Sequence, residues 1–189
     1  MSFIKYRVQK ILHINQKIKY NHYMFVITAL LSTVFFSPGL GCEKNIIQNI
    51  NDSNETIDAA VYAITNTDIV AALKNAHDRG VKIRILTDRT QAANKKSLVA
   101  DMRDYGINIR AHSKYRIEHN KFAIYDGVRL STGSYNWTQN ASANNSENCI
   151  FLDPGDPAIN DYQRRFNYLW HINTKKKSTE WDGWVIQHL

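Results

Sequence analysis

Strand-like and helix-like segments alternate through residues 56–109 of this 189-residue chain, and this alternation constrains the fold more than any other feature. Residues 56–64 (TIDAAVYAI) are β-rich and mostly apolar, as in a strand that is buried on both faces. Residues 67–79 place apolar side chains on one helical face, with Thr67 as the predicted N-cap and Gly80 as the stop. This repetition predicts an α/β layered fold with a mixed, largely parallel sheet flanked by helices on both faces.

The other predicted elements extend this pattern towards the C-terminus. Asp126-Gly127 between two apolar runs is a strong signal for a tight hairpin turn. The remaining predicted elements are helices over 42–52, 91–105 and 157–172 and strands over 81–86, 107–109, 122–125, 128–130 and 149–152. We therefore expect one domain over 32–173, an N-terminal segment over 1–31 and a C-terminal tail over 174–189.

The N-terminal segment has the order of a signal peptide or a short membrane anchor. Five basic residues and no acidic residue lie before residue 42, and an apolar run over 24–36 follows the basic part. That run is too short for a comfortable transmembrane helix. The alternative is that residues 32–36 form the first buried strand, which Pro38-Gly39 ends. Export or membrane association and a cytoplasmic location therefore stand as equal alternatives.

Composition favours a soluble globular protein, with 43% hydrophobic and 22% charged residues. The net charge of +7 suggests a nucleic-acid partner, but the charge is uneven, because 19 basic residues face 17 acidic ones beyond residue 41. Two cysteines, Cys42 and Cys149, lie far apart and lack the spacing of a zinc site. They could pair in an exported chain, but the apolar strand around Cys149 favours a buried free thiol.

The most informative stretch is 118–148, which carries the pattern H-x-K-x4-D-x6-G-S-x-N without a gap. The pattern consists of His119, Lys121, Asp126, Gly133, Ser134 and Asn136. His119 and Lys121 are two residues apart, so on a strand both side chains point to the same face. A neutral imidazole can attack phosphorus, and a lysine ammonium can hold the negative charge of the phosphoryl oxygens. Gly133 removes a side chain where the backbone and a phosphate would come close.

This pattern resembles the signature of the phospholipase D superfamily, and the chain is similar to its small, single-motif bacterial endonucleases. Phe36-Ser37-Pro38, Arg79-Gly80-Val81 and Glu147-Asn148 add to the resemblance. The resemblance implies a phospholipase D-like fold, hydrolysis of phosphodiesters through a phosphohistidine, and no metal or other cofactor. The catalytic residues that it implies are His119, Lys121, Ser134, Asn136, Glu147 and, less securely, Asp126. Asp126 has a structural alternative, because a hairpin would favour Asp-Gly in any case.

The single copy of the motif bears on assembly. One histidine cannot be nucleophile and leaving-group acid at the same moment, and the resemblance implies a homodimer whose two His119 residues converge on one cleft at a two-fold axis. Glu147 is then expected to accept a hydrogen bond from the far imidazole nitrogen.

The substrate stays open between nucleic acid and phospholipid. Lys114 and Arg116 are candidates for phosphate contacts or for a solvated run of charges. Trp137 is a candidate for stacking on bases, although packing beneath the site is the commoner use of such an aromatic residue. Glu118 places an additional carboxylate beside His119, in a position where a neutral residue is common in the family. Three functions are consistent with these residues: a nuclease, which we favour, a phospholipase D, for which the N-terminal segment would provide membrane association, and a silent binding module.

Overall fold

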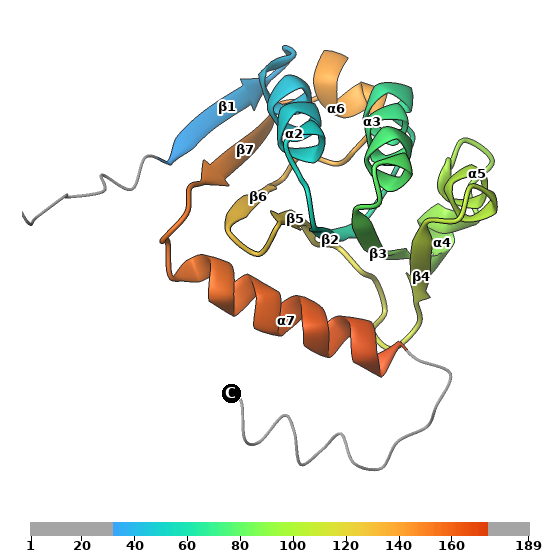
Figure 1. Cartoon of the computed structure of the whole chain (residues 1–189). Helices are drawn as coiled ribbons and strands as arrows, with labels where there is room; N and C mark the ends of the chain where they lie inside the picture. The colour runs from blue at the N-terminus through green and yellow to red at the C-terminus, as the bar shows by residue number, and fades with distance from the viewer. Residues whose placement is uncertain (1–31, 174–189) are drawn as a thin grey trace, which may run out of the picture.

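A mixed sheet of seven strands forms the centre of the computed structural model, which describes residues 32–173 (Figure 1). The strand order is β1-β7-β6-β5-β2-β3-β4. The strands are β1 Thr33–Ser37, β2 Thr56–Val61, β3 Lys82–Asp88, β4 Asn108–His112, β5 Lys121–Tyr125, β6 Arg129–Gly133 and β7 Glu147–Leu152. The helices are α2 Gly41–Asn51, α3 Thr67–Asp78, α4 Arg89–Ala92, α5 Val99–Asp104, α6 Gln139–Ala143 and α7 Ala158–Ile172. The predicted N-terminal segment over 1–31 and the tail over 174–189 lie outside the described residues.

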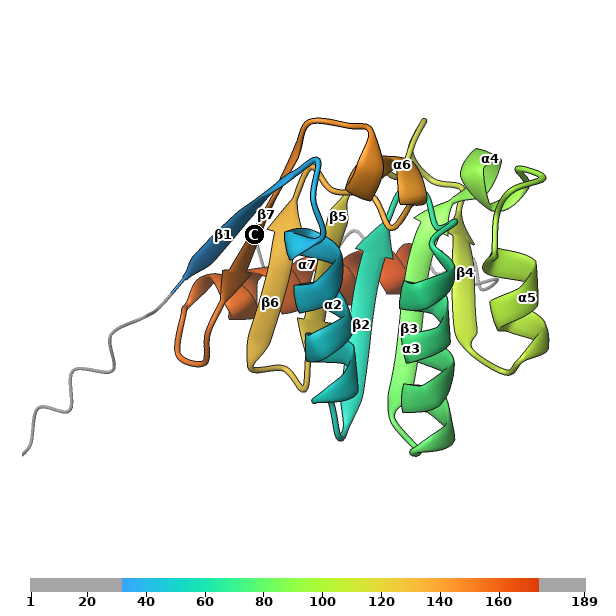
Figure 2. The same ribbon diagram turned by 90° about the horizontal axis from the view of Figure 1, so that it is seen from above.

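Helices cover both faces of the sheet, which confirms the predicted layered α/β fold. Helix α7 lies across one face, whereas α2 and α3 pack on the other (Figures 1 and 2). Each face has its own apolar cluster, and the α7 cluster includes Phe166 and Leu169, both fully buried. Strand β2 contributes to both clusters, since Ala59 lies in one and Ala60 in the other. The continuous apolar run of β2 therefore reflects its burial on two sides.

The sheet is mixed, as predicted, but parallel pairing is confined to one end of it. Strands β2, β3 and β4 pair in parallel, whereas the other four neighbouring pairs are antiparallel. The predicted Asp126-Gly127 hairpin is one cause, because it joins β5 directly to its antiparallel neighbour β6. Asp126 has φ 51° and Gly127 has φ 68°, the left-handed backbone that such a turn requires.

Three local predictions need correction. The helix predicted over 91–105 is two short helices, α4 and α5, because the side chain of Asn94 accepts a hydrogen bond from the Lys96 backbone N–H and favours a turn between them. The N-cap of α3 is Asn66 rather than Thr67, since the Asn66 side chain accepts hydrogen bonds from two backbone N–H groups of the first turn. The first strand forms, but at the edge of the sheet, where Phe36 is 69% exposed.

Cys42 and Cys149 form a disulfide between α2 and β7, with their Cα atoms 5.8 Å apart. Both residues are buried, as expected for Cys149, but the prediction of a free thiol is wrong. The reason lies in tertiary packing: Cys149 lies on the sheet face that α2 covers, and Cys42 is in the first turn of α2. Within residues 32–173, no helix is both long and apolar enough to cross a membrane.

Candidate active site

Most of the predicted catalytic residues lie at one edge of the sheet. Lys121 begins β5, Ser134 follows β6 and Glu147 begins β7. Because β5, β6 and β7 pair in antiparallel fashion, the start of β5, the end of β6 and the start of β7 meet at the same edge. Strand β1 extends this row, since its last residue, Ser37, pairs with Glu147.

His119 and Lys121 meet around the ring of Tyr62. The His119 imidazole contacts this ring edge-on, with centroids 4.7 Å apart, and the Lys121 Nζ lies 5.0 Å from its centroid. The Lys121 ammonium also donates a 2.6 Å hydrogen bond to the backbone carbonyl of His119. The tyrosine is itself held from behind, because Gln91 donates a hydrogen bond to its hydroxyl at 3.0 Å. Tyr62 was not singled out from the sequence, where it reads only as part of an apolar strand.

The Lys121 side chain is half-buried, and its environment alters its pKa. Burial lowers the pKa, while the negative charges of Glu147 and Glu118 act in the opposite direction. A partly desolvated ammonium interacts more strongly with an anion than one in bulk water. Because His119 is exposed beside it, this edge combines an accessible imidazole with a cation.

Ser134 and Glu147 form a second, tightly hydrogen-bonded part of the site. The Ser134 hydroxyl donates to Glu147 Oε2 at 2.5 Å, and the Asn145 amide donates to Glu147 Oε1 at 2.9 Å. The Glu147 backbone N–H donates to the Ser37 hydroxyl at 3.0 Å, which ties the row to β1. The Glu147 carboxylate thus faces Ser134 and Asn145, whereas we expected it to face the His119 imidazole.

Asn136 lies between this row and the core. Its side-chain oxygen is buried and has no hydrogen-bond partner within the described part of the chain. A buried polar atom without a partner is costly, so a donor from bound substrate or water would fit there.

Trp137 packs beneath the site, the commoner of its two expected uses, and is not available for stacking on bases. It is only 2% exposed and belongs to the apolar cluster beneath the site. Its backbone carbonyl accepts hydrogen bonds from Thr65 and Asn66 at 2.8 and 3.0 Å, which fixes the segment that follows β6 against the start of α3. Trp137 therefore holds Asn136 in place from below.

The backbone itself requires a glycine at position 133. A Cβ atom at this position would lie 2.3 Å from the Asn148 carbonyl oxygen, and the residue has φ 150°. The close approach lets the Ser134 backbone N–H donate to Asn148 Oδ1 at 3.0 Å.

Asp126 lies at the opposite end of β5 from Lys121, which favours the structural alternative for this residue over the catalytic one. Its carboxylate accepts hydrogen bonds from the backbone N–H groups of Asn54, Glu55 and Thr56, at 2.8 to 3.2 Å. Burial by itself raises the pKa of Asp126, but these donors together with Arg129 lower it below its usual value. The residue joins the hairpin to the start of β2.

The loop over 113–118 leads into His119 and has an exposed and a buried part. Lys114 and Arg116 are exposed, as expected for phosphate contacts. Glu118, in contrast, is 2% exposed and does not add a carboxylate to the site edge. It accepts two hydrogen bonds from Asn120, and its other oxygen lies 3.6 Å from Nδ1 of His112.

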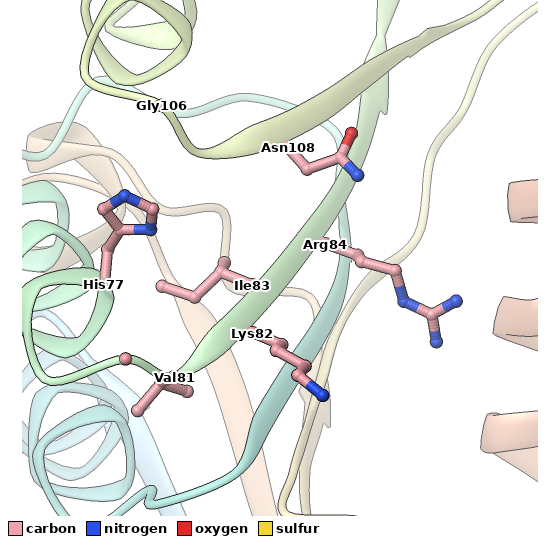
Figure 3. A pocket seen from close by; sticks show the side chains of 8 residues that line it. His77, Val81, Lys82, Ile83, Arg84, Gly106 and Asn108 are labelled. Atoms are coloured by element: carbon pink, nitrogen blue, oxygen red, sulfur yellow. The ribbon is translucent and has the colours of Figure 1, made fainter.

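A surface hollow of about 470 Å³ lies elsewhere, at the other ends of β3 and β4 (Figure 3). It is lined by His77, Gly80, Val81, Lys82, Ile83, Arg84, Gly106 and Asn108. Arg84 points away from His77, and its guanidinium is held by the buried carboxylate of Asp58 at 2.6 and 2.7 Å. This hollow therefore lies at the strand ends opposite the His119 edge. In residues 32–173, no group of three or more His, Cys, Asp or Glu side chains is arranged to hold a metal ion.

Comparison with known proteins gives the family. The family model for the cardiolipin synthase, PLD-like domain matches residues 46–170. The mitochondrial cardiolipin hydrolase of Chlamydomonas reinhardtii is 38% identical over 130 residues, which cover 68% of this chain and 57% of that protein. The phospholipase D of Rickettsia felis is 34% identical over 151 residues, covering 80% and 75% respectively. Nuc from Salmonella typhimurium, a phospholipase D family member of solved structure, has a TM-score of 0.72 at 27% identity and covers 78% of this chain and 99% of its own.

The chain therefore belongs to the phospholipase D superfamily. It carries a single copy of the histidine–lysine motif, at His119 and Lys121. It spans little more than half the length of the algal relative that it matches.

Proposed function

We propose that this protein is a phosphodiesterase that cleaves nucleic acid through a phosphohistidine at His119, as a two-fold homodimer and without a metal ion. The observation that carries the proposal is the meeting of His119 and Lys121 around Tyr62, beside Ser134 and Glu147 at one accessible edge. An exposed nucleophile next to a partly desolvated cation is what attack on a phosphodiester needs.

The reaction takes place in two displacements. In the first, a neutral ring nitrogen of His119 attacks phosphorus, the bond to the leaving oxygen breaks, and that oxygen takes a proton from the partner's His119. In the second, water attacks the phosphohistidine, the proton of the water returns to the partner's His119, and the phosphorus–nitrogen bond breaks. Lys121 balances the negative charge on the phosphoryl oxygens in both steps. The Ser134–Glu147 pair and Asn136 border the same space and complete its polar lining.

Nucleic acid is the favoured substrate because exposed cations lie immediately before the nucleophile. Lys114 and Arg116 precede His119 in an exposed loop, where they can contact phosphates on either side of the scissile one. A nucleic acid has a phosphate at every nucleotide, so it would contact Lys114 and Arg116 while one of its phosphates lies at His119.

A phospholipid is the second candidate. Two of the relatives that the chain resembles are named mitochondrial cardiolipin hydrolase and phospholipase D. In addition, Phe36 and Leu40 are 69% and 52% exposed on either side of Ser37-Pro38-Gly39, next to the Glu147 end of the site. Exposed apolar side chains beside a site suit an enzyme that works at a lipid surface.

One assay separates the two candidates. The purified full chain is offered plasmid DNA, single-stranded RNA and vesicles of phosphatidylcholine with cardiolipin, each with excess chelator. We expect nucleic-acid cleavage that persists in chelator, is lost in His119→Ala and is unchanged in His77→Ala, a histidine that lies at the opposite ends of the strands, beside the starts of β3 and β4. Headgroup release without nucleic-acid cleavage would establish the phospholipase instead, and loss of all activity in chelator would refute the metal-free reaction.

The dimer has its own test. Mixing wild-type chains with increasing His119→Ala chains should lower the activity per wild-type chain, because each mixed dimer lacks the second histidine. Activity that stays proportional to the wild-type chain present would show that each subunit acts alone.

A further inference from the structure

A patch of aromatic and basic side chains lies next to the proposed active site, and its aromatic members have no part in the reaction described above. We define the Tyr115 patch as Lys114, Tyr115, Arg116, Arg165 and Tyr168. The loop that carries its first three residues passes the C-terminal end of α7, which carries the other two (Figure 1). Tyr115 is four residues before His119, so their Cα atoms are at most about 14 Å apart. The patch therefore lies within a few nucleotides of the scissile phosphate.

Tyr115 is fixed in place although its ring is largely open to solvent. The ring stacks on the buried imidazole of His112, with centroids 5.3 Å apart and an interplanar angle of 12°. Its backbone N–H donates to His112 Nε2 at 2.8 Å, and its hydroxyl lies 3.2 Å from that of Tyr168. The residue is nevertheless 46% exposed. An aromatic ring that is already ordered loses little conformational freedom when a ligand stacks on it.

Cations surround this ring. The Arg165 guanidinium lies 5.9 Å from the centroid of Tyr115 and 5.3 Å from that of Tyr168, within the range of cation–π contacts. Lys114 and Arg116 flank Tyr115 in sequence and are exposed. The acidic residue nearest in the loop, Glu118, is buried and turned towards Asn120 and His112. The exposed part of the loop is thus positively charged.

We infer that the Tyr115 patch binds single-stranded nucleic acid, with one unpaired base stacked on Tyr115 and the adjoining phosphates on Lys114, Arg116 and Arg165. This inference rests on the proposed nuclease function and adds a strand preference to it. A base can stack on a protein ring only when one face of the base is open, and in a duplex the neighbouring bases cover both of its faces. Phosphate contacts alone would not distinguish single from double strands. The ordered, exposed tyrosine is what provides the distinction.

Binding is measured with the full chain carrying His119→Ala, by fluorescence anisotropy of labelled DNA: a single strand, the duplex of the same length, and a single strand without bases. Replacing Tyr115 by leucine should weaken binding of the single strand about tenfold, in line with the loss of one stacked base. Binding of the duplex and of the strand without bases should change less than about twofold, because phosphate contacts remain. Tyr115→Phe, which keeps the ring, should recover most of the lost affinity.

Tyr105 provides the matched control. It is 43% exposed and also has a cation over its ring, Lys74 at 4.8 Å, but it follows α5, at the sheet end opposite the His119 edge. Tyr105→Leu should leave all three affinities unchanged.

The inference is overturned if Tyr115→Leu leaves single-strand binding unchanged, or weakens single strand and duplex equally. It is also overturned if the substitution weakens only the binding of cardiolipin vesicles, which would make the patch a lipid-contacting surface. Failure of the proposed nuclease function would give a different result from failure of this inference. The chain without the His119 substitution would then cut no DNA or RNA, while its binding of the single strand would still depend on Tyr115.

Discussion

The carboxylate of Asp126 should stabilise the protein without taking part in catalysis, although it belongs to the motif that carries His119 and Lys121. At about 3.4 Å per residue along β5, Asp126 lies about 17 Å from Lys121, too far to touch a phosphate there. Its carboxylate instead accepts hydrogen bonds from three backbone N–H groups, those of residues 54, 55 and 56. Hydrogen bonds to a charged group contribute about 1.5–3 kcal/mol each, and bonds to a neutral one about 1 kcal/mol.

Asp126→Asn removes the charge and keeps a side chain that tolerates the left-handed backbone of this turn. We expect the free energy of unfolding to fall by about 2–3 kcal/mol, measured by urea denaturation at pH 7. Activity of the folded variant should stay within about threefold of wild type, whereas a group that stabilises the transition state would cost about 10²–10³-fold. Asp52→Asn is the matched control, because it removes a surface ion pair to Arg129, at 3.7 Å, and keeps an acceptor for the exposed hydrogen bond from Gln48, so it should cost less than about 1 kcal/mol.

The pH dependence gives a second measure of the same carboxylate. Because the folded state lowers the pKa of Asp126, its stabilisation is present above the pKa of the unfolded chain, about 3.9, and is lost as pH falls through the folded value. The difference in stability between wild type and Asp126→Asn should therefore be constant at neutral pH and shrink only below about pH 4. A large loss of activity in Asp126→Asn, with unfolding unchanged, would refute the structural role.

Three further predictions concern other parts of the domain. Replacing Cys42 and Cys149 together by serine should lower the free energy of unfolding by up to about 5 kcal/mol, because the cross-link joins residues 107 apart in sequence. The measurement is denaturation of the variant against oxidised wild type, and an equal midpoint for the two would show that the bond does not form. Burial lowers the pKa of His112, so the unfolded chain takes up a proton that the folded chain does not, and the free energy of unfolding should fall as pH decreases below about 6.5. The change in the free energy of unfolding with pH should be smaller in His112→Asn. An identical change in the two proteins would contradict a neutral buried imidazole. Burial lowers the pKa of Lys121, and the Glu147 charge offsets part of this effect. Glu147→Gln should therefore lower this pKa further and move the alkaline limb of the pH–rate profile to lower pH, whereas a shift to higher pH would show that the two groups are not coupled in this way.

The parts of the fold that the sequence predicted are those set by local pattern. The apolar run before residue 64 specified a strand buried on both faces, and Asp-Gly between two apolar runs specified the hairpin. The motif spacing likewise specified which residues would meet at one sheet edge, with Lys121 at the start of β5 and Ser134 after β6. Each of these signals depends on residues close together in the chain.

What could not be predicted depends on packing between distant segments. The pairing of Cys42 with Cys149 requires α2 to lie over β7, which no local pattern specifies. For Trp137 the sequence left base stacking and packing beneath the site as alternatives, and the contact of its backbone carbonyl with the start of α3 goes with a side chain buried in the core. Tyr62 was overlooked for the same reason, since only the register between β2 and β5 brings it to His119.

That register connects the two ends of β5. Val61 pairs with Lys121, and the next step of the ladder, from the Tyr62 N–H to the Asn120 carbonyl at 2.9 Å, places the Tyr62 ring against His119 and Lys121. A slip of one residue would send every β5 side chain to the other face, so Lys121 would leave the ring. At the far end, Asp126 binds the backbone that begins β2 and opposes such a slip. The aspartate of the motif, five residues beyond the lysine, thus helps to hold the β5–β2 register, while the proposed phosphate chemistry rests on the histidine and the lysine themselves.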